Sequence, residues 1–303
     1  LDLNKIIKDD YNNFIVGSNS PDGSIQVFNN LLSLNDFIDS FEDIEKIINL
    51  ESNNSYLFAS YQTQSNFGIL IFEYQNGIPI YKDFYDDFPY QITNITDLDI
   101  FEKYIIITTP EGIVKGNYQD DNLKFSNNWI SLDIPALAFE FYQDAEKIVI
   151  GGYNNLWKYE NENWINISLD FNDTLSDNYQ IVDIIKYNSQ VFILTKKQFF
   201  IMEDDNFEFS IPVNSEFTCL DLYNEKVVLG VKNNGFLIFD LLSNEYQIFT
   251  PNSPLHNQYD ALTILDDGTL AAVVNRIEQR SYSPTDNLAG ITLIDEGIFN
   301  NFI

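Results

Sequence analysis

The sequence has almost none of the residues that bind metals or form disulfides. It contains one cysteine, Cys219, and one histidine, His256. A single cysteine excludes an internal disulfide framework, and one cysteine with one histidine cannot supply a Cys/His zinc site. Cys219 lies in the alternating run FTCLDL, which is typical of a packed thiol in a strand, and His256 lies in a Pro/Asn-rich turn. We therefore expect no cofactor, no metal site and no histidine-based catalytic triad.

Positive charge is also scarce. The chain has 16 lysines and arginines against 46 aspartates and glutamates, which gives a formal net charge of −30. Binding to a nucleic-acid backbone or to an anionic membrane requires clustered cations, so neither is expected as a main function. No apolar run approaches the roughly 20 residues that span a bilayer, so we expect no membrane insertion of this segment. The chain begins at Leu1 and stops after an apolar run, which indicates a piece of a longer protein.

Helix-forming patterns are rare, and short β-branched and aromatic runs separated by Asn, Asp, Gly and Ser dominate the chain instead. One type of run, three mostly apolar residues followed by a small residue, recurs about every 42 residues, and a strand-only period of this length indicates propeller blades. The runs end at Gly17, Ala59, Thr108, Gly151, Thr195, Gly230 and Ala272. We predict an all-β fold, a seven-bladed β-propeller of four-stranded antiparallel blades; a β-solenoid or two packed β-sandwiches are the alternatives. The predicted blades of this single domain are residues 3–42, 43–90, 91–135, 136–177, 178–214, 215–255 and 256–303.

Each repeat divides into four segments with different characters. The second segment is apolar on both faces, as expected for a strand between two neighbouring blades. The small residue after it would leave room where blades converge. Both ends of the chain can supply complete blades, so we expect the ring to close by contact between blades, without an interleaved blade.

Several repeats resemble a known family. IIITTPEGIVKGNY, IVIGGYNNLWKYENENW and VVLGVKNNGFLIFDLLSNEYQIF resemble the two-component-regulator propeller repeat, in which an apolar run leads into Gly-Thr, a Gly-containing turn and an aromatic strand. The Trp expected before Gly-Thr is Ile, Val or Phe here, and the doubled glycine is present only at Gly151-Gly152. In style the chain is also similar to PorZ-type propellers of the type nine secretion system. The resemblance implies a non-catalytic, extracytoplasmic binding module, and it supplies no catalytic residues.

Motifs for catalysis are absent from the sequence. There is no sialidase box, Gly-x-Ser-x-Gly elbow or Walker loop. Acidic clusters in turns are interpreted first as solvated, with calcium binding or a glycosidase pair as alternatives. They comprise Asp83, Asp86 and Asp87, then Asp120 and Asp121, then Glu203, Asp204 and Asp205.

The two arginines of the chain, Arg276 and Arg280, fall in one segment, NRIEQRSYSPTDN, which is the longest insertion between a second and a third strand. Arginine pairs with carboxylate, phosphate or sulfate in a bidentate manner, and Tyr282 could add an aromatic contact. The alternative is that the arginines only offset local negative charge around Glu278. These three residues are the predicted ligand-binding residues.

We predict that the chain is a binding or scaffold module of an exported bacterial protein and not an enzyme. Its expected partner is a protein or glycan bound on the loop face, where aromatic residues such as Phe84, Tyr85, Phe88, Tyr90 and Tyr118 would contribute. A ligand-sensing ectodomain of a two-component signalling protein is the alternative, and a carbohydrate-active hydrolase or lyase is the second. The expected location is the periplasm, the cell surface or the outside of the cell.

Overall fold

The computed structural model describes most of the chain as strands joined by short turns. The described residues are 3–18, 24–29, 34–38, 43–119, 122–134, 140–144, 147–152, 155–161, 163–167, 180–203, 206–212, 216–223, 225–232, 235–249, 261–265, 268–274, 290–295 and 298–302. Within them the one helical element is a single 3-10 turn, Ser126–Asn128. None of the described segments is a helix of the length and hydrophobicity needed to cross a membrane.

The described strands form four-stranded antiparallel sheets, and each sheet consists of four strands that are consecutive in the chain. Sheet 1 contains β1 (Leu3–Lys8), β2 (Phe14–Ser18), β3 (Ile25–Phe28) and β4 (Leu34–Ile38). Sheet 2 contains β5 (Ile44–Ser52), β6 (Tyr56–Thr63), β7 (Phe67–Gln75) and β8 (Ile78–Tyr85). Sheet 3 contains β9 (Asp97–Phe101), β10 (Tyr104–Thr109), β11 (Gly112–Asn117) and β12 (Trp129–Leu132). Sheet 4 contains β13 (Glu140–Asp144), β14 (Lys147–Gly151), β15 (Leu156–Glu160) and β16 (Asn163–Asn166).

The second half of the chain repeats the same arrangement. Sheet 5 contains β17 (Ile181–Tyr187), β18 (Gln190–Thr195), β19 (Gln198–Glu203) and β20 (Asn206–Pro212). Sheet 6 contains β21 (Phe217–Tyr223), β22 (Lys226–Val231), β23 (Gly235–Asp240) and β24 (Glu245–Phe249). Sheet 7 contains β25 (Ala261–Ile264), β26 (Leu270–Val274), β27 (Gly290–Asp295) and β28 (Ile298–Phe302). The all-β class and the four-stranded antiparallel sheets predicted from the repeats are confirmed.

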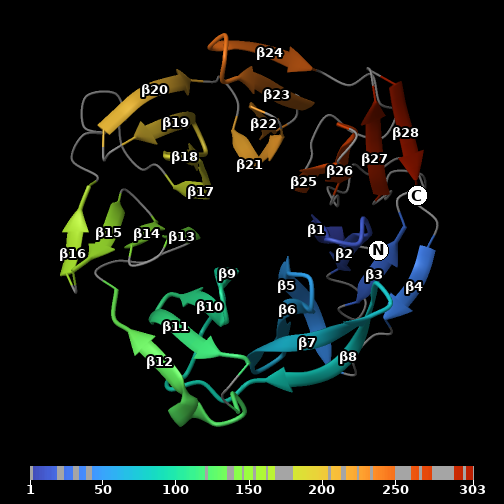
Figure 1. Ribbon diagram of the computed structural model, residues 1–303, viewed down its shortest axis with the longest axis vertical. Helices are drawn as coiled ribbons and strands as arrows, with labels where there is room; N and C mark the ends of the chain where they lie inside the picture. Colours follow the sequence, from blue (N-terminus) through green and yellow to red (C-terminus); the bar gives the residue numbers. More distant parts are fainter. Residues whose placement is uncertain are drawn as a thin grey trace, which may run out of the picture.

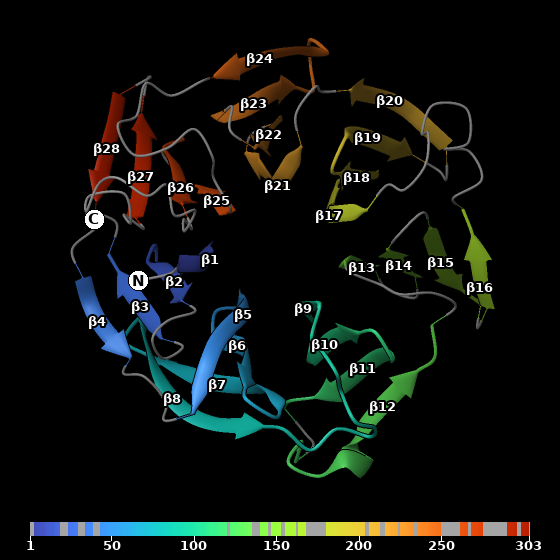
Figure 2. The same cartoon turned by 180° about the vertical axis from the view of Figure 1, so that it is seen from behind.

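The sheets are arranged around a central axis, with the first strand of each sheet innermost and the fourth outermost (Figure 1). Neighbouring innermost strands contact one another in chain order, and β1 contacts both β5 and β25. The view from behind shows the same order, with sheets 1 and 7 side by side (Figure 2). No described sheet mixes strands from the two ends of the chain, as the edge-contact prediction requires.

The hydrophobic core lies between the sheets. Each cluster of buried apolar residues combines two neighbouring sheets, and one of them joins sheet 1 to sheet 7. Strand β2 shows the cause: Phe14 and Val16 pack toward sheet 7, whereas Ile15 between them packs toward sheet 2. Because side chains alternate along a strand, a run that is apolar at every position can bury both faces. This confirms the predicted character of the second segment.

In three sheets a glycine lies at or next to the end of the second strand. A Cβ atom on Gly17 would lie 2.7 Å from Ile47 Cγ2 of sheet 2, and one on Gly151 would lie 2.7 Å from Ile181 of sheet 5. Gly230 differs, since its Cβ would meet Thr218 and Cys219 of its own sheet. The prediction that small residues make room between sheets is therefore confirmed for Gly17 and Gly151 and wrong for Gly230.

Candidate functional site: the central channel and its lysine-lined mouth

A pocket of about 480 Å³ opens at the end of the channel where the innermost strands begin. We call it the mouth pocket. It is formed by residues from sheets 2, 3, 5 and 6: Lys46, Ile48, Asn94, Ile95, Thr96, Gln180, Ile181, Val182, Lys196, Glu216, Phe217, Thr218 and Lys232. Pockets of this size suit small organic ligands.

Two of the three lysines occupy equivalent positions in successive sheets. Lys196 directly follows β18 and Lys232 directly follows β22. The backbone of Lys196 is fixed from two sides, because its N–H donates to Gln180 O at 3.2 Å and its carbonyl accepts from Phe217 N–H at 2.8 Å. Lys232 N–H donates to Glu216 O at 2.7 Å. The lysines therefore project from a rigid rim.

Positive charge dominates the described lining of this pocket. Glu216 is its single described acid, and its carboxylate lies 3.1 Å from Lys232 Nζ. The hydrogen bond and charge of Lys232 lower the pKa of Glu216, and Lys196 and Lys197 lower it further. Glu216 thus behaves as an acid in a locally positive field.

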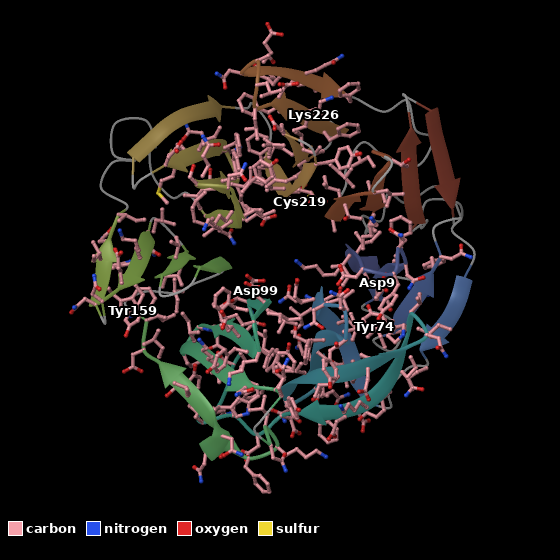
Figure 3. All side chains as sticks on the ribbon, viewed as in Figure 1. Asp9, Tyr74, Asp99, Tyr159, Cys219 and Lys226 are labelled. Carbon is pink, nitrogen blue, oxygen red and sulfur yellow. The ribbon has the colours of Figure 1, made fainter. Side chains whose placement is uncertain are left out.

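Behind the mouth pocket, the interior of the channel is acidic. A cavity of about 640 Å³ is lined by the innermost strands of sheets 1, 2, 3, 5, 6 and 7. Glu51, Asp97, Asp99, Asp183 and Asp221 belong to this lining. Figure 3 shows Asp99 at the inner rim of the ring. These acids come from the innermost strands of different sheets and not from the acidic turns considered in the sequence.

Burial raises the pKa of every one of these carboxyl groups. The pKa of Asp99 and that of Asp221 rise to about 6, and the pKa of Glu51 rises well above its ordinary value. For Asp97 and Asp183 burial again dominates and raises the pKa, while Lys5 on β1 opposes the rise. The channel therefore holds carboxyl groups whose protonation changes near neutral pH.

Two of the aspartates also connect neighbouring sheets. Asp183 Oδ2 accepts the N–H of Leu220 on β21 at 3.0 Å. Asp221 Oδ2 accepts the N–H of Ile264 on β25 at 3.0 Å, while its Oδ1 accepts the N–H of Leu222 at 2.7 Å. These bonds satisfy inner-strand amides that face the next sheet. Their geometry assigns the aspartates a structural role in the ring.

The residues predicted from sequence to bind ligand are not part of this described site. Arg276, Arg280 and Tyr282 lie outside the described residues, as does His256. Their segment connects Val274 at the end of β26 to Gly290 at the start of β27, and these two residues are paired. This end of sheet 7 corresponds to the ends of β18 and β22, which Lys196 and Lys232 follow.

Three of the described acids in the turns considered in the sequence have hydrogen-bond or ion-pair partners. Asp83 lies 2.8 Å from Lys124 Nζ, Asp87 accepts the N–H of Ser126 at 3.0 Å, and Glu203 accepts Ser189 Oγ at 2.9 Å. Asp120, Asp121, Asp204 and Asp205 are outside the described residues. In the described part of the chain, no group of three or more His, Cys, Asp or Glu side chains is arranged to hold a metal ion.

The aromatic residues expected in exposed loops are mostly packed. Phe84 and Tyr85 belong to strand β8, and only Phe84 is largely exposed. Phe88 is buried, and Tyr85, Tyr90 and Tyr118 pack against the cluster between sheets 2 and 3. The expectation of an aromatic loop surface is therefore wrong for most of this set. Cys219 lies on strand β21 and packs, partly buried, against the cluster between sheets 6 and 7, as predicted for a packed thiol.

Neither the lysines of the mouth pocket nor the acids of the channel were predicted from the sequence. One signal was available for each. Lys196-Lys197 is an adjacent lysine pair directly after the small residue that ends a second segment. The first segments ITDLDIF, IVDIIKY and FTCLDLY each carry one or two acids inside a mostly apolar run.

Comparison with solved structures identifies the architecture. The extracellular domain of a hybrid two-component system, BT4673 from B. thetaiotaomicron, superposes with a TM-score of 0.67 at 16% identity over 89% of this chain. The WD40 β-propeller domain of Doa1 superposes with a TM-score of 0.66 at 11% identity, over 89% of this chain and 88% of its own. The fold is a β-propeller.

The relationship extends to the fold alone. This chain spans about a third of the BT4673 extracellular domain, 36% of its length. No family model matches the sequence, and no curated protein matches it.

Proposed function

We propose that this chain is a seven-bladed β-propeller that binds a ligand at the mouth pocket without catalysing a reaction, and that it acts as a sensing domain outside the cytoplasm. The observation that carries the proposal is the recessed pocket of about 480 Å³, in which four sheets contribute charged and neutral polar side chains above an apolar floor. The fold likeness to the extracellular domain of a two-component system supports the sensing role.

The seven-bladed ring is the structural part of this proposal. The seven predicted ranges, 3–42, 43–90, 91–135, 136–177, 178–214, 215–255 and 256–303, each contain the four strands of one sheet. The cluster between sheets 1 and 7 supports closure, because Ile6 and Phe14 pack there with Ala271 and Val273. A closed ring leaves no long exposed inner edge and holds the mouth pocket rigid.

A ligand screen tests the binding function. The isolated chain is mixed with neutral oligosaccharides, organic acids and short peptides, and its melting temperature is measured. A ligand that binds only the folded state increases the free energy of unfolding by RT ln(1 + [L]/Kd) and so raises the melting temperature. At 100 times its Kd, the ligand adds about 2.7 kcal/mol to the free energy of unfolding. Stabilisation by one class that is lost when the mouth-pocket residues are changed supports the proposal. A chain that no compound stabilises contradicts it.

Arg276, Arg280 and Tyr282 remain proposed ligand residues, since their segment joins sheet 7 at the mouth end of β26. Replacing both arginines with Ala should change the free energy of unfolding by less than about 1 kcal/mol, as for surface positions. Ligand binding should weaken, whereas Lys226→Ala at the other end of β22 should leave it unchanged. A large loss of stability in the double variant would show a structural role for the pair.

The sensing role and a scaffold role in type nine secretion differ in what adjoins the propeller. A membrane helix leading to a signalling domain supports sensing, and a sorting domain supports the scaffold. Sequencing the gene outward from both ends decides between them. Fractionation of cells that produce the full protein tests the proposed location, because protein found in the cytoplasm would contradict it.

One observation favours a second candidate function, a carbohydrate-active hydrolase. Asp97 on sheet 3 and Asp183 on sheet 5 interact electrostatically in the channel, and both have raised pKa values, as a general acid requires. Assaying the chain and its Asp97→Asn variant against chromogenic glycosides tests this candidate. Turnover that Asp97→Asn abolishes without loss of folding would replace the binding proposal with an enzymatic one.

A further inference from the structure

We infer that the mouth pocket binds an elongated small molecule with an anionic group at each end. This inference rests on the proposed binding function and adds the chemical class of the ligand. Its basis is the excess of lysines over acids in the described lining of this pocket, in a chain whose net charge is −30. With 46 acids against 16 lysines and arginines, a surface of average composition would carry mostly acids.

The charged side chains that line the mouth pocket are mostly lysines. Lys46, Lys196 and Lys232 belong to the lining, and Glu216 is the single acid among the described lining residues. Lys232 is paired with Glu216 at 3.1 Å. Within the described part of the chain, Lys46 and Lys196 have no carboxylate within ion-pairing distance. Among the described lining residues, two positive charges therefore stand outside an ion pair and can meet a ligand.

The three lysines come from different parts of the ring. Lys46 lies on β5 of sheet 2, whereas Lys196 and Lys232 follow strands of sheets 5 and 6. Sheet 2 lies across the channel from sheets 5 and 6 in both views of the ring (Figures 1 and 2). A ligand that uses both sets of lysines must carry its anionic groups apart.

Apolar and neutral polar side chains also line the mouth pocket. Ile95 and Phe217 are buried at 0% and 2% exposure and form part of an apolar floor. Asn94, Gln180 and Thr218 add neutral side chains that can donate or accept hydrogen bonds. The centre of the ligand is therefore uncharged, with apolar or hydroxyl-bearing groups. The lysine ammonium is a point charge with rotatable donors and imposes no planar geometry on its partner. A carboxylate, a sulfate ester or a phosphate ester can therefore each serve as the anionic group at either end of the ligand.

The test uses a series of unbranched α,ω-dicarboxylates of increasing length, with monocarboxylates of equal length, inorganic sulfate and inorganic phosphate as comparisons. Affinity is measured by calorimetry at low ionic strength, where exposed charges are least screened. We expect dicarboxylates of one length range to bind about tenfold or more tightly than the matching monocarboxylates, with affinity falling as salt rises. Preference for inorganic sulfate or phosphate over every dicarboxylate would overturn the elongated ligand.

The chain offers a matched control for the lysines. Lys232 follows the end of β22, and Lys226, which is labelled in Figure 3, begins the same strand at its other end. Lys46→Gln and Lys196→Gln should each weaken binding of the best dicarboxylate about tenfold without changing the melting temperature. Lys226→Gln should leave affinity unchanged. Equal losses in Lys226→Gln and Lys196→Gln would show nonspecific attraction and overturn the inference.

The same measurements separate failure of this inference from failure of the proposed function. If no dicarboxylate binds but a neutral oligosaccharide binds and is lost in Lys196→Gln, the ligand class is wrong and the binding function stands. If no compound of either class binds the folded chain, both are wrong.

Discussion

At the scale of single residues, the acids of the innermost strands combine two opposing effects. Asp183 and Asp221 accept amide hydrogen bonds from the next sheet, which stabilises the ring. Burial makes the ionised forms of both carboxyl groups unfavourable and therefore raises their pKa. An oxygen acceptor is needed at these positions, whereas the negative charge is not.

Asp221 gives a pH prediction. Its pKa rises from 3.8 in the unfolded chain to about 6 in the folded protein, so the folded state binds this proton more tightly. Its contribution to stability is therefore fully present below pH 3.8 and is lost as the pH rises through about 6. In Asp221→Asn the single amide oxygen can still accept one of the two N–H groups, from Leu222 or Ile264, and no charge forms. We expect its melting temperature to fall less than that of the wild type between pH 4.5 and 7.5.

Two further variants control this measurement. Asp221→Ala removes the acceptor of two backbone amides and should destabilise by about 1–3 kcal/mol at both pH values. Asp86→Asn removes the same charge from an exposed position and should leave the slope of melting temperature against pH unchanged. If Asp86→Asn flattened the profile as much as Asp221→Asn, the pH dependence would come from net charge and not from the channel.

At the scale of strands and sheets, the sequence was sufficient to predict the order of the elements. The second strand of each repeat can be predicted from its local sequence, because a short run that is apolar at every position is typical of a strand with two buried faces. Gly17 and Gly151 could be assigned to crowded positions because each ends such a run. The packing of Gly230 against Thr218 and Cys219 could not be predicted, since it depends on side-chain positions within one sheet.

The contact between Gly151 and Ile181 can be tested by a double-mutant cycle. Gly151→Ala places a Cβ 2.7 Å from Ile181, so we expect a loss of about 1–3 kcal/mol in the free energy of unfolding. Gly151→Leu should be more damaging still. In the Ile181→Ala background the clashing atoms are absent, and the cost of Gly151→Ala should fall. Denaturant unfolding of the four proteins gives the coupling, and strictly additive effects would contradict the contact between sheets 4 and 5.

At the scale of the whole molecule, the site could not be predicted because it is assembled from distant parts of the chain. Lys46 and Lys196 are separated by three sheet boundaries along the sequence but line one pocket. Only closure of the ring places sheet 2 opposite sheets 5 and 6. The arginine segment attracted attention in the sequence because its residues are adjacent, whereas the lysines become a group only in three dimensions.

Closure of the ring gives the prediction for the whole molecule. Phe14 is 1% exposed and packs at the contact between sheets 1 and 7, whereas Phe192 is fully buried between sheets 5 and 6. In a closed ring both contacts belong to one cooperative unit, so Phe14→Ala and Phe192→Ala should each destabilise the whole molecule by about 3–5 kcal/mol. Hydrogen exchange by mass spectrometry should show protection lost evenly across all sheets in both variants. An open ring would respond differently: Phe14→Ala would then expose sheets 1 and 7 in a separate, lower-temperature transition while sheets 3 to 5 stayed protected. That outcome would also remove the rigid frame that holds Lys46 opposite Lys196, so the contact between sheets 1 and 7 and the mouth pocket depend on each other.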